Sequence, residues 1–171
     1  MIAYLYLAVA VVGAGIHLAV SRPRTLHRAT GIMLTWAFAV LVGAGGIIGA
    51  GFHVFAADQT ARQIGWAPGS PFQFENAMGD LAFGVLGILC IWLRSGFWIA
   101  TAIGWSIQML GDAYGHIYQL VAHGDSAPDN AGAILYTDIA FPIIVLALLG
   151  VWLWSRRSAG GEPAVGGEVL R

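Results

Sequence analysis

The sequence predicts an all-α integral membrane protein, a bundle of five transmembrane helices, from its composition, its apolar segments and the placement of its arginines. Hydrophobic residues make up 58% of the 171 residues, charged residues only 10%, and the mean hydropathy is +0.74. A soluble domain carries about 25% charged residues, so this chain has too few to cover a water-facing surface. The net charge of −1 argues against nucleic acid as a partner, because nucleic acid requires a basic face.

The apolar segments define the individual spans. A helix needs about 20 mostly apolar residues to cross a bilayer. The first such segment is followed, not preceded, by positive charge, so we expect a retained helix and not a signal peptide. The spans together form one transmembrane domain, residues 1–157, and the Gly-rich residues 158–171 are expected to form a flexible cytoplasmic tail. The predicted spans are residues 2–20, 30–55, 77–93, 97–119 and 133–154.

The connections and the small residues shape the predicted bundle. Residues 57–76 are predicted to be a loop, rich in Trp, Phe and Pro, that suits the headgroup zone and covers a pocket. Residues 94–96 leave room only for a tight hairpin between the third and fourth spans. Two GxxxG pairs, Gly45/Gly49 and Gly111/Gly115, permit close approach of helices. We expect both pairs to serve packing inside the bundle rather than dimerisation.

The arginines predict the orientation, because basic residues collect on the cytoplasmic side of a membrane. The chain has no Lys, so all 8 basic residues are Arg. With the N-terminus outside and the C-terminus cytoplasmic, Arg62 falls outside and every other Arg falls on the cytoplasmic side. This bias also favours an odd number of spans. Trp92, Trp98, Trp152 and Trp154 would then lie near the inner interface, where aromatic belts form.

Three Asp residues inside the spans need an explanation, because a charge at the bilayer centre costs about 2.5–3.5 kcal/mol. With a rise of about 1.5 Å per residue, Asp80, Asp112 and Asp138 lie roughly 21, 22 and 24 Å from the cytoplasmic ends of their helices. In a hydrocarbon core about 30 Å thick, three helices thus place a carboxylate in one layer. Such a layer indicates either a polar functional site, or acids that are protonated or are held as structural pins by hydrogen bonds.

Other polar residues extend this layer. His116 follows Asp112 by four residues and therefore lies on the same face of its helix. His53 ends the second span near the outer boundary, and Glu75 stands at the entrance to the third. We expect an outward-facing polar pocket that binds an ion or small ligand, built from His53, Glu75, Asp80, Asp112, His116 and Asp138.

The residue types allow several kinds of chemistry in this pocket. Imidazole and carboxylate groups suit Zn, Mn or Fe, and such a metal would activate water for hydrolysis. Haem between His53 and His116 is an alternative, as is a relay of protons or cations. The sequence has no HExxH, GxSxG or phosphate-binding motif, so it leans against an enzyme and leaves the cofactor open. The candidate metal ligands are His53, Asp112, His116 and Asp138.

Four phrases of the sequence resemble a known family. In this order, over residues 45–150, they resemble a family of small bacterial inner-membrane proteins known only as a domain of unknown function. The resemblance implies bacterial origin and a multi-pass protein of the bacterial cytoplasmic (inner) membrane, and it implies no activity. It also implies that position 80 varies, which makes Asp80 the weaker member of the pocket. The phrases are IGWAPGSPFQFE (64–75), DLAFGVLG (80–87), GDAYGHIYQ (111–119) and NAGAILYTD (130–138).

The function predicted first is the binding of an ion or small ligand by an otherwise uncharacterised multi-pass membrane protein. A structural or assembly subunit of a larger membrane complex is the alternative, and a membrane-embedded metalloenzyme is the third possibility. The expected partners are the lipid bilayer, the ion or small-molecule ligand, and a membrane-protein partner or further copies of the chain.

Overall fold

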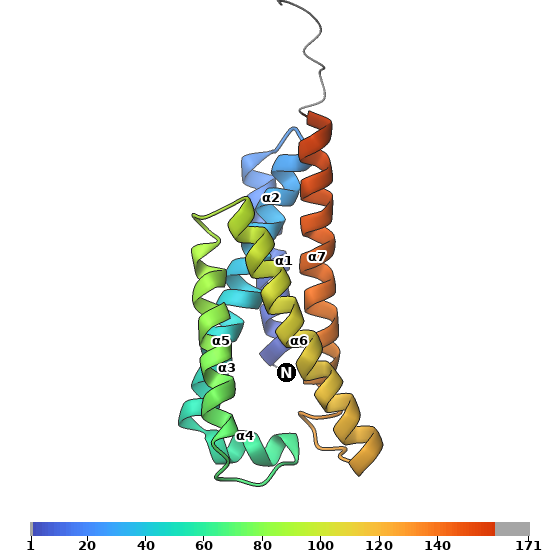
Figure 1. The fold of residues 1–171 in the computed structure, drawn as a ribbon. Helices are drawn as coiled ribbons and strands as arrows, with labels where there is room; N and C mark the ends of the chain where they lie inside the picture. The colour runs from blue at the N-terminus through green and yellow to red at the C-terminus, as the bar shows by residue number, and fades with distance from the viewer. Residues whose placement is uncertain (1, 160–171) are drawn as a thin grey trace, which may run out of the picture.

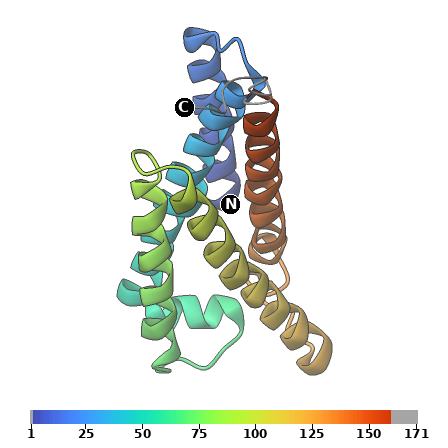
Figure 2. The same ribbon diagram turned by 45° about the horizontal axis from the view of Figure 1, so that its top comes forward.

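The computed structural model describes the backbone of residues 2–159 and the side chains of residues 2–156, and this part of the chain is all-helical (Figure 1). Since α2, η1 and α3 follow one another without a break, the described chain forms five long helical rods and one short helix, α4 (Figures 1 and 2). The elements are α1 (Ile2–Ser21), α2 (Leu26–Trp36), η1 (Ala37–Ala44), α3 (Gly45–Phe55), α4 (Ala57–Ile64), α5 (Phe72–Leu89), α6 (Gly96–His123) and α7 (Ala133–Ala159).

The predicted spans correspond to these rods. Three of the described helical segments are long and apolar enough to cross a membrane: Ile2–Ser21, Leu26–Phe55 and Ala133–Arg156. The all-helical fold is therefore confirmed, and the chain has helices suited to a membrane, whereas α5 and α6 are not among the three. Of the predicted tail, residues 160–171 lie outside the described residues.

The prediction of a loop over residues 57–76 is wrong. Residues 57–64 form α4, which buries Ala61 and Ile64 against the bundle and exposes Arg62. The helix ends at Gly65, whose φ of +88° is a conformation that favours glycine. After a short turn, α5 begins at Phe72, since Pro71 has a φ of −62° that suits the start of a helix. The helix ends at Leu89, several residues before the predicted end at 93.

The second rod contains a stretch of π-helix, η1, between two α-helical parts. At its end the Gly45 N–H donates to the Val40 carbonyl, five residues back, instead of four. Insertions of this kind widen the helix and turn the following side chains to another face. The rod therefore changes the face that it presents along its length.

Glycines bring α5 into backbone contact with this rod. A Cβ atom added to Gly87 would lie 2.5 Å from the Gly43 nitrogen, and one added to Gly46 would lie 2.6 Å from the Asp80 carbonyl oxygen. The predicted packing role of Gly111 and Gly115 is wrong, because an added Cβ would meet nothing within 4 Å at either position. The close backbone contact between α5 and the second rod is made by glycines three residues apart, and not by GxxxG pairs: Gly43 and Gly46 on the rod, and Gly84 and Gly87 on α5.

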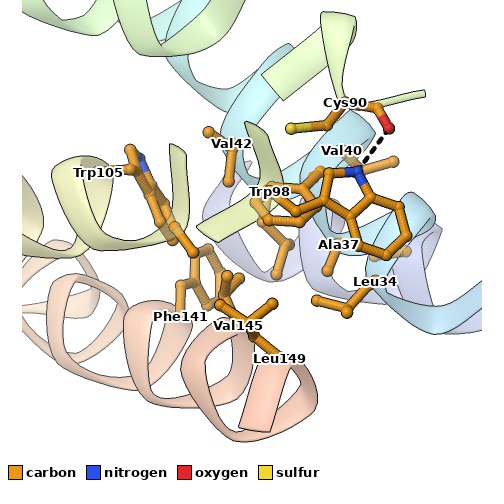
Figure 3. Close-up of a cluster of buried hydrophobic side chains, with 14 of the residues drawn as sticks. Leu34, Ala37, Val40, Val42, Cys90, Trp98, Trp105, Phe141, Val145 and Leu149 are labelled. Atoms are coloured by element: carbon orange, nitrogen blue, oxygen red, sulfur yellow. Dashed lines mark hydrogen bonds between the residues drawn. The ribbon is translucent and has the colours of Figure 1, made fainter. Parts of the chain in front are cut away.

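One end of the bundle is filled by large apolar side chains (Figure 3), and we call it the core end. Trp98 is 0% exposed, and its ring centroid lies 5.6 Å from that of Phe38 and 5.0 Å from that of Trp152. Its indole N–H donates to the Cys90 carbonyl at 2.8 Å, shown as the dashed line in Figure 3. The expected belt of tryptophans at the inner interface is thus divided, since Trp98 and Trp152 belong to the core.

Candidate functional site

The opposite end of the bundle encloses a cavity of about 750 Å³. It arises because α5 packs on α3 and α6 packs on α7, while α5 and α6, joined at residues 90–95, diverge from each other (Figures 1 and 2). The start of α1 and one side of α4 complete the lining. We call this half of the molecule the cavity end.

One wall of the cavity, formed by α3 and α5, carries His53 in a set of polar contacts. The His53 Nδ1 lies 2.7 Å from the Gln73 Oε1, and since an amide oxygen only accepts, Nδ1 holds the hydrogen and donates. The Asn76 amide lies 3.2 Å from His53 Nε2 and donates to it. The same Nε2 faces the Asp80 Oδ2 at 3.9 Å, and Asp80 Oδ1 accepts from Gln108 Nε2 of α6 at 2.9 Å.

The opposite wall, formed by α6 and α7, repeats this arrangement around His116. The buried Asn130 amide donates to the backbone carbonyls of Asp125, at 2.7 Å, and of His116, at 3.3 Å. Its oxygen therefore accepts from His116 Nδ1, at 2.8 Å, which leaves Nε2 facing the Asp138 Oδ2 at 3.7 Å. Each wall thus holds a histidine whose Nδ1 is bound by an amide oxygen and whose Nε2 points at an aspartate.

Asp138 and Asp112 differ from Asp80 in having no protein donor. Asp138 is 5% exposed, lines the cavity and makes no hydrogen bond to the described residues. Asp112 also lines the cavity and has neither a hydrogen bond nor an ion pair within the described chain. Electrostatic interactions link Asp112 to Asp80, Asp138 and His116. The three carboxylates predicted in one layer therefore share one cavity.

Glu75 is the one predicted pocket residue that the structure does not bring to the cavity. It is exposed in the first turn of α5 and is absent from the lining, whereas Asn76 beside it belongs to the lining. Residues one position apart on a helix point about 100° apart, so a depth estimate along the helix does not tell which of them faces inward.

The candidate metal ligands line the same cavity without surrounding one point. Among residues 2–156, no three His, Cys, Asp or Glu side chains are arranged to hold a metal ion. His53 belongs to the α3–α5 wall, whereas Asp112, His116 and Asp138 belong to the α6–α7 wall. The arrangement as it stands therefore offers separate polar groups around an open volume and not a coordination sphere.

The sequence reasoning missed the four side-chain amides that orient the histidines and Asp80. A signal was present, because Gln108, Asp112 and His116 follow at i, i+4 and i+8 on one helix face. Including the neutral polar residues on the same helix face as the charged ones would have found Gln108. The same step on α5 would have found Gln73 and Asn76. The missed residues are Gln73, Asn76, Gln108 and Asn130.

The α4 segment closes the far end of the cavity. The Asp129 N–H, from the α6–α7 connection, donates to the Gln63 carbonyl at 3.1 Å and so ties this connection to α4. Trp66 lines the cavity beside it and packs edge-on against Phe72 at 5.0 Å. The Trp66 Nε1 is buried and has no hydrogen-bond partner in the described part of the chain. Residues 57–76 therefore cover the pocket, as a helix and turn rather than as a loop.

Comparison with known families places the chain. The model of a family of unknown function (DUF6790) matches residues 1–159 of the 171. The chain belongs to this family. The DUF6790 match extends the predicted resemblance, over residues 45–150, to nearly the whole chain, and by itself it says nothing about bacterial origin or a membrane. The curated proteins and the solved structures that were compared give no match.

Proposed function

We propose that this DUF6790 protein crosses a membrane five times and binds a small positively charged ligand or ion in its cavity. The rods α5 and α6 serve as spans in this account, although polar residues interrupt their apolar sequence. Those polar residues, Asp80, Gln108, Asp112 and His116, have partners across the cavity or line it. The outward faces of the two helices are apolar: Leu81, Val85, Leu89, Ile103, Ile107 and Leu110 are exposed. Such a division suits lipid outside and a polar site inside.

The proposed orientation places the cavity end and the N-terminus outside the cytoplasmic membrane of a bacterium. It is supported by the arginines, because Arg22, Arg24, Arg28, Arg94 and Arg156 all lie at the core end. Ser95→Cys and Ser126→Cys, each in a Cys90→Ala background, test it with an impermeant thiol reagent on intact bacterial spheroplasts. Ser126→Cys is expected to react, and Ser95→Cys only after lysis. The reverse pattern would overturn the orientation, and labelling of both from outside would overturn α6 as a span.

The ligand proposal depends on one observation: Asp112 and Asp138 face the cavity and receive no hydrogen from the protein. A carboxylate withdrawn from water requires donors or a positive charge nearby. Among the described residues, none of those that line the cavity is an arginine. A cation inside the cavity would supply what the protein does not, and its charge would be shared by Asp80, Asp112 and Asp138.

Thermal unfolding of the purified chain in an uncharged maltoside detergent tests this proposal. The chloride salts of sodium, potassium, magnesium, calcium, zinc, ethylammonium and 2-phenylethylammonium are compared on the parent, Asp112→Asn and Glu75→Gln. Glu75→Gln is the matched control, because it removes an exposed acid outside the cavity. A ligand at about 100 times its Kd adds about 2.7 kcal/mol to the stability. At least one cation should therefore raise Tm in the parent and the control, but not in Asp112→Asn. A set of cations without effect, or with equal effect on Asp112→Asn, would overturn the proposal.

A role as a subunit of a larger membrane complex is the second candidate, favoured by α1. This helix buries only Ala3, Ala10 and Ala14, so it packs through small residues. Its large apolar side chains, Leu5 and Ile16 among them, remain exposed. The mass of the detergent-purified protein particle distinguishes the roles, since a lone copy favours a self-sufficient binding protein. A stable complex that is lost when Ile16 is changed to Ser would favour the subunit.

A further inference from the structure

We propose that the ligand is a protonated organic amine with an apolar body, which rests on the cation-binding function proposed above. The inference joins three features of the cavity end: surplus acceptors in one cavity, an apolar wall next to them, and a volume much larger than an ion. Each feature restricts the chemistry of the ligand in a different way.

The acceptors require a ligand that brings N–H groups. Of the three central carboxylates, only Asp80 receives a hydrogen bond from a described residue, through Gln108. Asp138 is more than nine-tenths buried, and the His116 Nε2 lies 3.7 Å from its Oδ2, beyond a hydrogen bond. Asp129 adds a fourth acid to the lining. A primary ammonium group offers three donors together with a positive charge, whereas a quaternary ammonium offers charge alone.

The two histidines also favour a ligand that donates hydrogen bonds. His53 and His116 each use Nδ1 to bind an amide oxygen, so each presents Nε2 to the cavity side, next to an aspartate. In the neutral ring of His116 this Nε2 is a further acceptor, whereas His53 Nε2 already accepts from the Asn76 amide. A purely accepting ligand would therefore find no donor in the two neutral histidine rings, and the buried N–H without a partner among the described residues of the lining is that of Trp66, at the α4 side of the cavity.

The apolar wall indicates the body of the ligand. Trp105 precedes Asp112 by seven residues on α6, a rise of about 10 Å toward the core end, and Phe141 follows Asp138 by about one turn on α7. Both line the cavity, so an ammonium group among the carboxylates would have an apolar surface next to it on the core side. Tyr6, Leu41 and Met109 also line the cavity. An alkyl or aryl body about 10 Å long fits this distance.

The volume excludes a bare ion as the best fit. The cavity of about 750 Å³ lies within the range of roughly 300–1,000 Å³ that is typical of pockets for small organic molecules. No three His, Cys, Asp or Glu side chains converge on a point within residues 2–156. A small metal ion would therefore leave most of the space unfilled and would lack a preformed set of ligands.

A matched set of probes tests each part of the inference by isothermal titration in cacodylate buffer and maltoside micelles. This buffer is not an amine, as Tris is, and it does not precipitate zinc, as phosphate does. The probes are 2-phenylethylamine, 2-phenylethanol, 2-phenylethyl-trimethylammonium, ethylamine and zinc chloride. They are titrated into the parent, Asp112→Asn, Glu75→Gln and Gly115→Leu, with micelles alone as the blank. Gly115→Leu fills the cavity from a position where nothing lies within 4 Å of an added Cβ, so the fold is retained. Unchanged Tm values of the variants check this.

The inference predicts that 2-phenylethylamine binds the parent and Glu75→Gln, and binds Asp112→Asn and Gly115→Leu at least tenfold more weakly. The alcohol, the trimethylammonium compound and ethylamine should each bind the parent at least tenfold more weakly than the amine. Equal binding of the alcohol or of the trimethylammonium compound would overturn the need for a charged N–H donor. Zinc binding that depends on Asp112, without amine binding, would overturn the amine and leave cation binding intact. If none of the probes binds in an Asp112-dependent way, both proposals fail.

Discussion

The core end and the cavity end are built from the same helices and differ in what fills the space between them. At the core end, Trp98 of α6 fills the gap between Phe38 of η1 and Trp152 of α7, and its N–H is satisfied by the Cys90 carbonyl. At the cavity end, α5 and α6 have separated, and polar residues line an open volume. The comparison indicates a division of labour between the two ends of the bundle. The core end contributes most of the stability, and the cavity end carries polar groups that do not stabilise the fold and are explained by a function.

Glycines explain how one bundle accommodates both ends. Gly87 and Gly46 allow the backbone of α5 to pack against the second rod along its length. α5 therefore stays with that rod, while α6 diverges from it. Gly111 and Gly115 lie on the cavity side of α6, where the absence of side chains leaves the space open. Glycine therefore permits close packing of α5 on the second rod and leaves open space beside α6.

The largest expected effect comes from Trp98→Ala at the core end. Removal of a fully buried tryptophan costs about 3–5 kcal/mol, and here it also leaves the Cys90 carbonyl without its donor. Trp66→Ala, at the cavity end, should cost about 1 kcal/mol or less, because Trp66 is partly exposed and borders an open volume. Reversible unfolding in mixed micelles, followed by circular dichroism, measures both. Equal losses of stability would contradict the division of labour.

An intermediate effect is expected for Gly87→Ala. The added methyl group would meet the Gly43 nitrogen at 2.5 Å and the Phe38 oxygen at 2.8 Å, so α5 has to move away from the second rod. Overpacking of this kind costs about 1–3 kcal/mol. Gly111→Ala is the matched control on α6 and should change the stability by less than about 0.5 kcal/mol. The same unfolding assay compares them, and a neutral Gly87→Ala would show that the α5 interface is not close-packed.

The smallest expected effect on stability comes from Asp138→Asn. The carboxylate accepts no hydrogen bond from the described residues, so its loss removes no favourable contact, while the new amide can donate to His116 Nε2. We expect the free energy of unfolding to stay the same or to rise by about 1 kcal/mol, while ligand binding falls. A loss of more than about 1 kcal/mol would instead indicate that Asp138 is a structural residue.

The sequence predicted the long helices well, because each of them is mostly apolar over a length that suits a long helix, although polar residues interrupt α5 and α6. It did not predict α4, whose eight residues are too few and too polar to stand out from a loop. It placed Trp98 and Trp152 at a membrane interface, because composition does not distinguish an aromatic residue in a belt from one in a core. Packing between helices distant in sequence decides that difference.

The candidate site was predicted only in part, again because packing between helices decides which side chains meet. Depth along a helix follows from counting residues, so the three aspartates were expected at one level, and they do share one cavity. The direction of a side chain depends on how the helix is rotated in the bundle. Glu75 and Asn76 are neighbours in sequence, yet only Asn76 reaches the cavity. The supporting amides were missed because neutral polar residues carry less penalty in a membrane than acids.

The central claim is that the cavity binds cations and therefore admits them, and the reactivity of a cysteine at position 115 tests it most directly. Gly115→Cys in a Cys90→Ala background is treated with a cationic and an anionic methanethiosulfonate reagent, and each rate is divided by that reagent's rate with free 2-mercaptoethanol. A cleft lined by one sign of charge raises association rates of opposite charges by about 10-fold or more. The account predicts that the cationic reagent reacts at least about 10-fold faster and that Asp112→Asn reduces this preference. An unreactive cysteine, or one that reacts as fast with the anionic reagent, would contradict it.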